Sequence, residues 1–523
     1  MRTRPPPQAP AAPPRPAAPQ AGWRHGAPRA LGVPLLFLAA SLLLRAIAFV
    51  PAVVDTDEGL YIVQAREWLR GGWPFVAVWD MHPVGAPALF VLAFLLFGES
   101  IAAVRLLGAL CVAATAWALY GVVRAGGGPR AAAIAAGLLY IAYSLHLGGM
   151  ATNTELLFAP LVVAAIAIGL RAARRALMAG EAPRWRDLVA MGLLIGAGFA
   201  VKPVVAPEGC LAFALLTFPA LWRGALPPWR FLAMAAAYAG LCLLPTALFG
   251  LAYLLRGEFA AFLDGSFLAP FRYAMGRIAA GEAARLSLVA ALILAWPFAL
   301  AGLAAMRWAA RRGRMGRLVR TGLLWLAVAS LAIIGPGYFF QHYFLIWLPP
   351  LCLLAGLGAW RLARLARPAL ARPAFALAIG AVIADAWLGA FVPRFYQGTG
   401  YVRPDPVREV GRAVAAEIVP GDAIFVANYH PVTYFLAGAE VPTRFVFPAH
   451  LTGSFARVAD VDTDAELRRV LEERPRVIVV DRGWWWTIRP AAAAMITAAL
   501  AEGYELAATV AEERGPVEVW RRR

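Results

Sequence analysis

Lysine is almost absent from this sequence of 523 residues, because Lys202 is the only lysine among 49 basic residues. Charged residues make up 15% of the chain, whereas soluble globular domains average about 25%. The four cysteines lie inside apolar runs and show neither metal-ligand spacing nor a disulfide pattern. These shortages exclude an ordinary soluble enzyme and a disulfide-stabilised secreted domain.

Long apolar runs are the feature that the chain has in abundance, since 61% of its residues are hydrophobic. A helix needs about 20 apolar residues to cross a membrane. The runs that we expect to span are residues 31–51, 101–123, 131–149, 153–170, 188–202, 205–222, 231–255, 286–306, 321–337, 343–360 and 373–392. The sequence therefore predicts an all-α polytopic membrane bundle with about eleven spans.

The net charge of +18 is best explained by membrane topology. Residues 1–30 contain five arginines and no acid in a tract rich in proline and alanine, which predicts a disordered cytoplasmic tail. The loops that follow residues 123, 170, 222, 306 and 360 contain two, five, two, six and four arginines. The positive-inside rule places these loops in the cytoplasm. No nucleic-acid partner is expected.

Residues 52–100 then form a large outer loop. Its apolar segment 83–97 is too short for a span, so we expect a helix at the outer interface or a partly re-entrant helix. Residues 59–70 have apolar side chains at helical spacing and predict an amphipathic helix lying on the membrane.

The tail 393–523 has a different composition, with mixed polar and apolar residues. Residues 423–428 and 476–481 read as buried strands, and residues 463–473 and 490–502 read as helices. This pattern predicts a small α/β domain outside the cytoplasm. The expected organisation is a tail over 1–30, a transmembrane domain over 31–392 and an extracytoplasmic domain over 393–523.

Polar residues gather on the outer face of this topology. Ionisable side chains at membrane depth are costly and are candidates for function. The candidates are Asp55, Asp57, Glu58, Asp80 and His82 in the first outer loop, Asn153 and Glu155 in a later turn, Lys202 at a span end, and His342 and Tyr343 before a late span. Four separate stretches thus deliver acids, a lysine and histidines to one face, which is typical of an active site.

Each candidate also has a structural interpretation. Asp57 and Glu58 are also explained as solvated loop acids or helix caps, and His342 as a residue of the interfacial aromatic belt. Lys202 has the alternative of an interfacial anchor, although arginine would serve equally well there. A compact ammonium suits a phosphate, which favours a functional role for this lysine.

The chain resembles the GT-C membrane glycosyltransferases, and most closely the bacterial branch of glycosyltransferase family 39. The likeness rests on DTDEGLYIVQAREWLRGG (55–72), WDMHPVGAPALF (79–90), ATNTELLFAP (151–160), GFAVKP (198–203), QHYFLIWLPPL (341–351) and residues 424–453. Relatives in this group include protein O-mannosyltransferases, the aminoarabinose lipid A transferase and Rgt-type transferases. The acidic first-loop motif is the most specific of these stretches.

The resemblance implies inverting transfer of a sugar from a polyprenyl-phosphate donor to a lipid, glycan or protein acceptor. It implies that Asp57 is the base or the carboxylate that orients the acceptor, that Glu58 supports it, and that Asp80 is the second acidic site of the loop. The expected substrate- and phosphate-binding residues are Lys202, His82, Tyr61, Asn153, Glu155, Arg272, His342 and Tyr343. Relatives often have Lys-Pro after the second acid, whereas this chain has His82-Pro83. No cofactor is certain, and a divalent metal is open.

The expected location is a bacterial inner membrane, with the active site facing the periplasm. Two alternatives stay open at this point. One is a polytopic lipid or glycan transporter or flippase, against which the sequence shows no internal repeat and no glycine-broken helix pair. The other is an oligosaccharide polymerase or ligase, which shares the topology and the chemistry.

Overall fold

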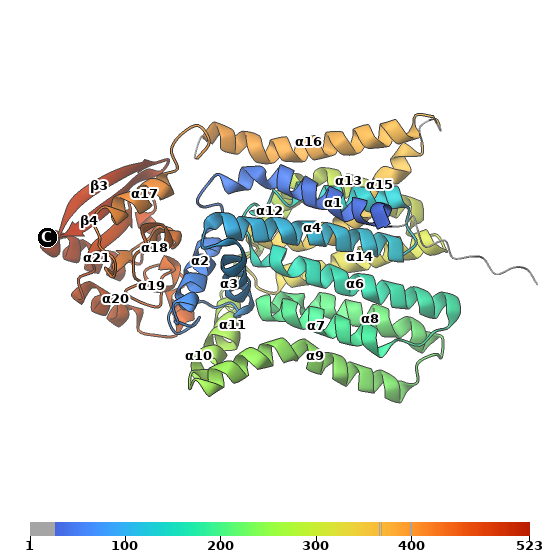
Figure 1. Cartoon of the computed structure of the whole chain (residues 1–523), viewed down its shortest axis with the longest axis horizontal. Helices are drawn as coiled ribbons and strands as arrows, with labels where there is room; N and C mark the ends of the chain where they lie inside the picture. Colours follow the sequence, from blue (N-terminus) through green and yellow to red (C-terminus); the bar gives the residue numbers. More distant parts are fainter. Residues whose placement is uncertain (1–26, 366, 368, 398–399) are drawn as a thin grey trace, which may run out of the picture.

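A helical bundle makes up most of the computed structural model, which describes residues 27–365, 367, 369–397 and 400–523. The long helices run along the longest axis, and a small sheet lies beyond one end of them (Figure 1). The bundle helices are α1 (Ala27–Arg45), α4 (Ile101–Ala125), α5 (Arg130–Tyr143), α6 (Thr154–Ala179), α7 (Trp185–Val201), α8 (Ala206–Trp222), α9 (Pro228–Leu255), α12 (Ala280–Ile293), α13 (Ala295–Trp308), α14 (Arg314–Ile334), α15 (Leu348–Ala363) and α16 (Ala371–Gln397). The expected tail lies outside the described residues, apart from positions 27–30 at the start of α1.

The protein is a multi-pass membrane protein, because eight of its described helices are long and apolar enough to cross a membrane. The bent pair α12–α13 raises this number to nine. Two further predicted spans correspond to α5 and α7, which have 14 and 17 residues and are shorter than the ~20 residues of a typical span. The eleven predicted segments are therefore all helical, while length and composition support eight or nine spans.

The predicted span 286–306 is bent, since α12 and α13 meet at an angle of 80°. Pro297 lies in the first turn of α13. A proline ring clashes with the carbonyl four residues before it and offers no backbone N–H, so the helix cannot continue from Ile293 through this turn. No glycine-broken helix pair was predicted, and this break is marked by proline.

The predicted outer loop, residues 52–100, forms two helices across the end of the bundle, α2 (Thr56–Leu69) and α3 (Gly85–Phe97), as Figure 1 shows. The 13 residues of α3 confirm that 83–97 is too short to span. The interfacial role predicted for residues 59–70 is wrong, because all positions from Glu58 to Glu67 are buried. Protein covers both faces of α2, since it packs against α3 and against a helix of the sheet region.

The C-terminal region is the predicted α/β unit. Strands β1 (Ile424–Val426) and β2 (Val477–Asp481) are parallel and match the two predicted strands. The hairpin of β3 (Tyr504–Glu512) and β4 (Gly515–Arg522) was not predicted, and it completes a sheet of order β1-β2-β4-β3. The helices of this region are α17 (Pro406–Ala415), α18 (Val432–Ala437), α19 (Pro448–Leu451), α20 (Thr463–Glu472) and α21 (Pro490–Gly503).

Buried polar contacts attach this region to the loop 52–100. The guanidinium of Arg66 on α2 donates to the carbonyl oxygens of Tyr434 and Ala439, each at 2.8 Å. Gly59 approaches α18 so closely that a Cβ there would lie 3.1 Å from the backbone nitrogen of Val432. The sheet region therefore holds α2, and with it the acidic motif, against the end of the bundle.

Candidate active site

Asp55 is the centre of a hydrogen-bonded group at the end of the bundle nearest the sheet. One carboxylate oxygen accepts the backbone N–H of Asp57 at 3.2 Å, which caps α2. The other accepts the Asn153 amide at 3.1 Å and lies 3.3 Å from Nδ1 of His342. Burial alone would raise the pKa of Asp55, but the hydrogen bond and charge of His342 outweigh it and hold the pKa below its ordinary value.

Asp57, in the first turn of α2, is perturbed in the opposite direction. Burial, and after it the negative charge of Asp55, raise the pKa of Asp57 from 3.8 to about 6. A carboxylate with a pKa near neutrality can both hold and release a proton at physiological pH. The two neighbouring acids therefore differ in their pKa, which is lowered for Asp55 and raised for Asp57.

Asp80 and His82 form a second acidic unit in the loop between α2 and α3. Nδ1 of His82 lies 2.9 Å from a carboxylate oxygen of Asp80, which is 2% exposed. Burial would raise the pKa of Asp80, but the charge and hydrogen bond of His82 hold it below its ordinary value. The ring of Tyr61 stands edge-on to the His82 ring, with the centroids 6.1 Å apart. Asp80 and Tyr61 together fix the orientation of the imidazole.

Lys202 is the residue directly after α7, and its buried ammonium has three partners. Its ammonium lies 2.7 Å from Oε1 of Glu155 and 3.2 Å from the hydroxyl of Thr154, at the start of α6. The same ammonium lies 4.5 Å from the centroid of the Tyr343 ring. An ammonium has three N–H donors, and Glu155 and Thr154 accept two of them. The third donor has no hydrogen-bond partner among the described residues.

Glu58 lies next to these groups and connects neighbouring segments of the chain. Its carboxylate accepts the Nε–H of Arg105 on α4 at 2.8 Å and the backbone N–H of Thr152 at 2.6 Å. Arg105 in turn donates to the carbonyl oxygen of Ala48 at 2.6 Å. Glu58 therefore ties α2 to α4 and to the turn before α6, and it holds its neighbour Asp57 in place.

An apolar pocket of about 380 Å³ opens beside this cluster. Its walls come from the loop 81–83, the end of α7, the start of α8, α11 (Ala269–Ala274) and the end of α14. Proline and phenylalanine are the most frequent residues in the lining, and the polar side chains of His82, Lys202 and Tyr343 also line it. The buried hydroxyl of Ser266, also in the lining, has no hydrogen-bond partner among the described residues. The pocket thus combines an apolar body with a polar end.

Asp55, Asp57 and His342 are also placed to hold a metal ion. One ligand atom from each lies within 4.8 Å of the others, and two carboxylates with an imidazole suit a divalent transition metal. The carbonyl oxygen of Asn153 is buried without a partner among the described residues, while the amide nitrogen of this side chain bonds to Asp55. The residues present therefore fit a divalent cation, and His342 and Asn153 would hold it with the two acids.

The structure brings ten of the eleven predicted site residues together at this end of the bundle. They are Asp57, Glu58, Tyr61, Asp80, His82, Asn153, Glu155, Lys202, His342 and Tyr343. Arg272 on α11 belongs to a different network, because it donates to Asp264 at 2.6 Å and to the carbonyl oxygen of Val458 at 2.9 Å. A sequence alone offers no signal that these two partners already occupy its guanidinium.

Three residues beside this cluster, Asp55, Tyr273 and Ser266, have no specific role in the prediction from the sequence. Asp55 was grouped with the acidic motif, and its position directly before a helix start is the available signal for a cap. Tyr273 donates to or accepts from the hydroxyl of Tyr343 at 3.2 Å, and Ser266 lines the pocket. Both come from the short helical segments between α9 and α12, whose place beside Lys202 depends on the tertiary fold.

Comparison with known proteins identifies the class of this fold. ArnT from Cupriavidus metallidurans bound to undecaprenyl phosphate has a TM-score of 0.64 at 19% identity, over 94% of this chain and 98% of that one. Its apo state gives a TM-score of 0.62 at 17% identity over the same shares. The archaeal oligosaccharyltransferase AglB from Archaeoglobus fulgidus, in complex with an inhibitory peptide and a dolichol-phosphate, gives 0.52 at 14% identity, over 93% of this chain and 74% of that one. The chain therefore has the GT-C membrane fold.

The family match is more specific. Residues 81–249 match the model of the dolichyl-phosphate-mannose-protein mannosyltransferase family. The matched segment runs from the loop after Asp80 to α9 and includes His82, Asn153, Glu155 and Lys202. No curated protein sequence matches the chain. The resemblance to GT-C glycosyltransferases predicted from the sequence is confirmed.

Proposed function

We propose that this protein is an inverting glycosyltransferase that moves a sugar from a polyprenyl-phosphate donor to a hydroxyl-bearing acceptor. The observation that carries the proposal is the junction of the polar cluster with the apolar pocket, because His82, Lys202 and Tyr343 belong to both. A polyprenyl phosphate has the same two parts, an apolar chain and an anionic head. The similar fold of ArnT, which binds undecaprenyl phosphate, supports this assignment.

In the proposed reaction, the carboxylate of Asp57 accepts the proton of the acceptor hydroxyl. The acceptor oxygen forms a bond to the anomeric carbon of the sugar, on the face opposite the phosphate. The bond between this carbon and the phosphate oxygen breaks, and its electron pair leaves with the phosphate. The products are a glycosylated acceptor with inverted configuration and a free polyprenyl phosphate, and Asp57 later returns its proton to water.

Cationic groups stabilise the leaving phosphate in this proposal. Lys202 and His82 line this pocket from separate segments, and their N–H groups would contact the phosphate. Charge-assisted bonds to a phosphate are strong, and they strengthen further in a site with little water. Because phosphate is already a good leaving anion, these donors suffice and no strong general acid is needed.

The other residues act by position. Asp80 orients His82, Glu58 holds α2 in place, and Asn153 orients Asp55. His342 and Tyr343 close the site from the 3-10 turn Gln341–Trp347 before α15, and Tyr61 packs on the His82 ring. A divalent cation at Asp55, Asp57 and His342 would supply further positive charge for the donor.

The same proposal includes the cell location. We assign the chain to a bacterial inner membrane, with the site facing the periplasm and residues 393–523 as a domain on that side. The arginine-rich loops support this orientation, because they follow the ends of α4, α6, α8, α13 and α15, away from the site. Lipid A, another glycan or a protein is the acceptor class that this location allows.

A lipid transporter is the second candidate function, because broken helices such as the α12–α13 pair line substrate paths in transporters. A single experiment separates the two. Purified protein is supplied with a polyprenyl-phosphate sugar and an acceptor glycolipid extract, and the release of free polyprenyl phosphate is measured, with Asp57→Asn as the control. A transporter moves the intact donor across a vesicle membrane and releases no polyprenyl phosphate.

A further inference from the structure

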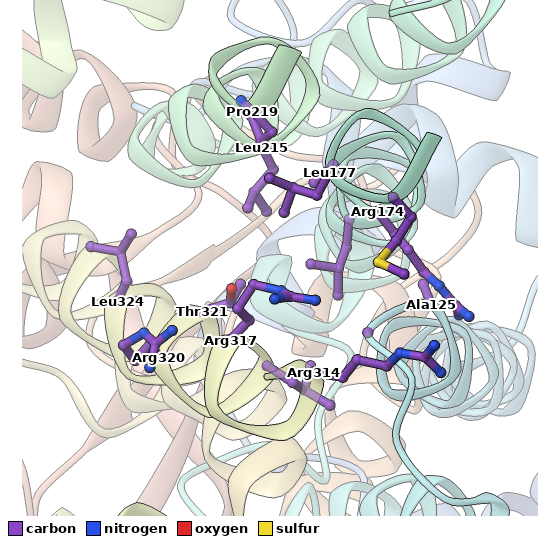
Figure 2. A pocket seen from close by; sticks show the side chains of 15 residues that line it. Ala125, Arg174, Leu177, Leu215, Pro219, Arg314, Arg317, Arg320, Thr321 and Leu324 are labelled. Atoms are coloured by element: carbon purple, nitrogen blue, oxygen red, sulfur yellow. The ribbon is translucent and has the colours of Figure 1, made fainter. Parts of the chain in front are cut away.

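A second pocket lies at the opposite end of the bundle from the acidic cluster. It has a volume of about 270 Å³ and is enclosed by the end of α4, the second half of α6, α8 and the first half of α14. Four arginines line it, and the rest of the lining is largely apolar, with no acidic residue. Figure 2 shows the side chains of these helices around the opening, with Arg317 extending into the space between them. The arginines are Arg174, Arg314, Arg317 and Arg320.

The positive charge of this pocket is not balanced by the protein. Arg320 donates to the carbonyl oxygens of Ala309 and Arg311, each at 3.0 Å, and so caps the end of α13. Arg174, Arg314 and Arg317 have no carboxylate partner among the described residues. Arg175, the residue next to Arg174, differs from these three arginines because it forms an ion pair with Asp187.

Helix stability does not explain the position of two of these arginines. Arg314 and Arg317 lie in the first turn of α14, which contains no acidic residue. The N-terminal end of a helix carries a partial positive charge, so cations there are unfavourable. An anion bound in the pocket would be attracted both by the three free guanidinium groups and by the end of this helix.

The walls of the pocket indicate the rest of the ligand. Leu170, Leu177, Leu215 and Leu324 add an aliphatic surface to the lining, and Leu324 is 53% exposed at the bundle surface. The pocket lies at the end of the bundle where the arginine-rich loops are found, away from the sheet (Figure 1). Basic pockets between membrane helices on the cytoplasmic side suit phospholipid head groups, which bring acyl chains with them.

We propose that this pocket, formed by α4, α6, α8 and α14, is a binding site for the phosphate head group of an anionic phospholipid of the inner leaflet. The guanidinium groups of Arg174, Arg314 and Arg317 hold the head group, and the leucines of α6, α8 and α14 contact its acyl chains. The site is independent of the glycosyl-transfer site, which lies at the other end of α6 and α14.

The test uses the full-length protein in nanodiscs of phosphatidylcholine. Cardiolipin is titrated in, bound lipid is counted by native mass spectrometry, and the thermal unfolding midpoint is recorded. We expect one tightly held cardiolipin and a rise in the midpoint, because a ligand that binds only the folded state stabilises it. Arg174→Gln/Arg314→Gln/Arg317→Gln should weaken binding about a hundredfold, since each basic residue near a lipid head group contributes a factor of about five.

The matched control is Arg171→Gln/Arg186→Gln/Arg312→Gln, which removes three exposed arginines that do not line the pocket. This control should bind cardiolipin as the wild type does. Arg317→Gln alone provides a milder lining variant, with an expected loss of about fivefold, in case the triple variant does not fold.

Three results would overturn the proposal. The first is unchanged cardiolipin affinity in the folded lining variants. The second is an equal loss in the control triple, which would show a general charge effect. The third is an equal rise of the unfolding midpoint with inorganic phosphate alone, which would assign the pocket to a free phosphate.

Discussion

The ammonium of Lys202 and the carboxylate of Glu155 form a buried ion pair at 2.7 Å, with side-chain exposures of 6% and 1%. The only lysine of the chain is therefore both a candidate phosphate ligand and one half of an internal pair. These two roles have different energetic consequences, because a buried ion pair that loses one partner leaves an uncompensated charge.

The first prediction separates the two roles of Lys202. Lys202→Ala should lower the free energy of unfolding by about 3–5 kcal/mol and abolish transfer. Lys202→Met/Glu155→Gln should recover most of the stability, because no unpaired charge is left, yet it should stay inactive. Lys202→Arg should recover part of the activity, since a planar guanidinium does not occupy the place of a point charge.

Chemical denaturation and the rate of polyprenyl phosphate release check these outcomes. Normal turnover in the stable double variant would remove Lys202 from the phosphate site.

The second prediction concerns Asp57→Asn, which keeps the shape of the side chain and removes the base. We expect the turnover rate to fall by a factor of ~10² or more, the usual scale for loss of a general base. Stability should be unchanged or higher. At pH 7 the carboxylate is charged in both states, and its folded pKa of about 6 lies above the ordinary 3.8, so the charged form is disfavoured in the fold.

Glu58→Gln is the control for a positioning role. It should lower stability by weakening the Arg105 contact, and its activity should follow the folded fraction. Near-normal turnover in folded Asp57→Asn would reject the first-loop mechanism.

The third prediction follows from the pKa of Asp57. The base must be ionised, so kcat/KM should rise with pH through an inflection near 6 and be lost tenfold per pH unit below it. The profile is measured with a chelator present and again with added Mn²⁺. A cation at Asp55 and Asp57 favours the ionised carboxylates and would move the inflection to lower pH. A profile without an inflection between pH 5 and 7, with the chelator present, would contradict the assignment of Asp57.

The fourth prediction concerns His82, which stands where relatives often have lysine. His82→Ala should raise the KM for the donor about tenfold, because one charge-assisted contact to phosphate is lost. His82→Lys should keep most of the activity, since an ammonium can pair with Asp80 and still reach the pocket. Arg272→Gln is the matched control, because Arg272 is bonded to Asp264 and Val458 instead. A larger effect from Arg272→Gln than from His82→Ala would show that the phosphate lies elsewhere.

The fifth prediction is the topology. Reporter fusions after residues 127 and 315 should read as cytoplasmic, and a fusion after residue 450 should read as external. A cytoplasmic signal at 450 would place the acidic cluster on the inner face. That result would also move the arginine-lined pocket of α6 and α14 to the outer leaflet.

Local chemistry made much of the fold predictable from the sequence. Apolar runs and arginine-rich loops depend on composition over about 20 residues, so the bundle and its expected orientation could be read directly. The buried strands around Phe425 and Ile478 have the same local origin, and the structure confirms both. The break at Pro297 was missed because the apolar composition continues across it, although the cause is a single residue.

The residues of the acidic cluster could also be predicted from the sequence, because the predicted topology alone assigns polar residues to one face. Which of these residues contact one another could not be predicted. Lys202 pairs with Glu155, 47 positions away, and Asp55 meets His342 across most of the bundle sequence. Burial of α2 between bundle and sheet converts an apparent surface helix into a fixed support for Asp57. Such pairings depend on how the helices pack. Packing depends on contacts between segments far apart in the sequence, which a local sequence pattern does not show.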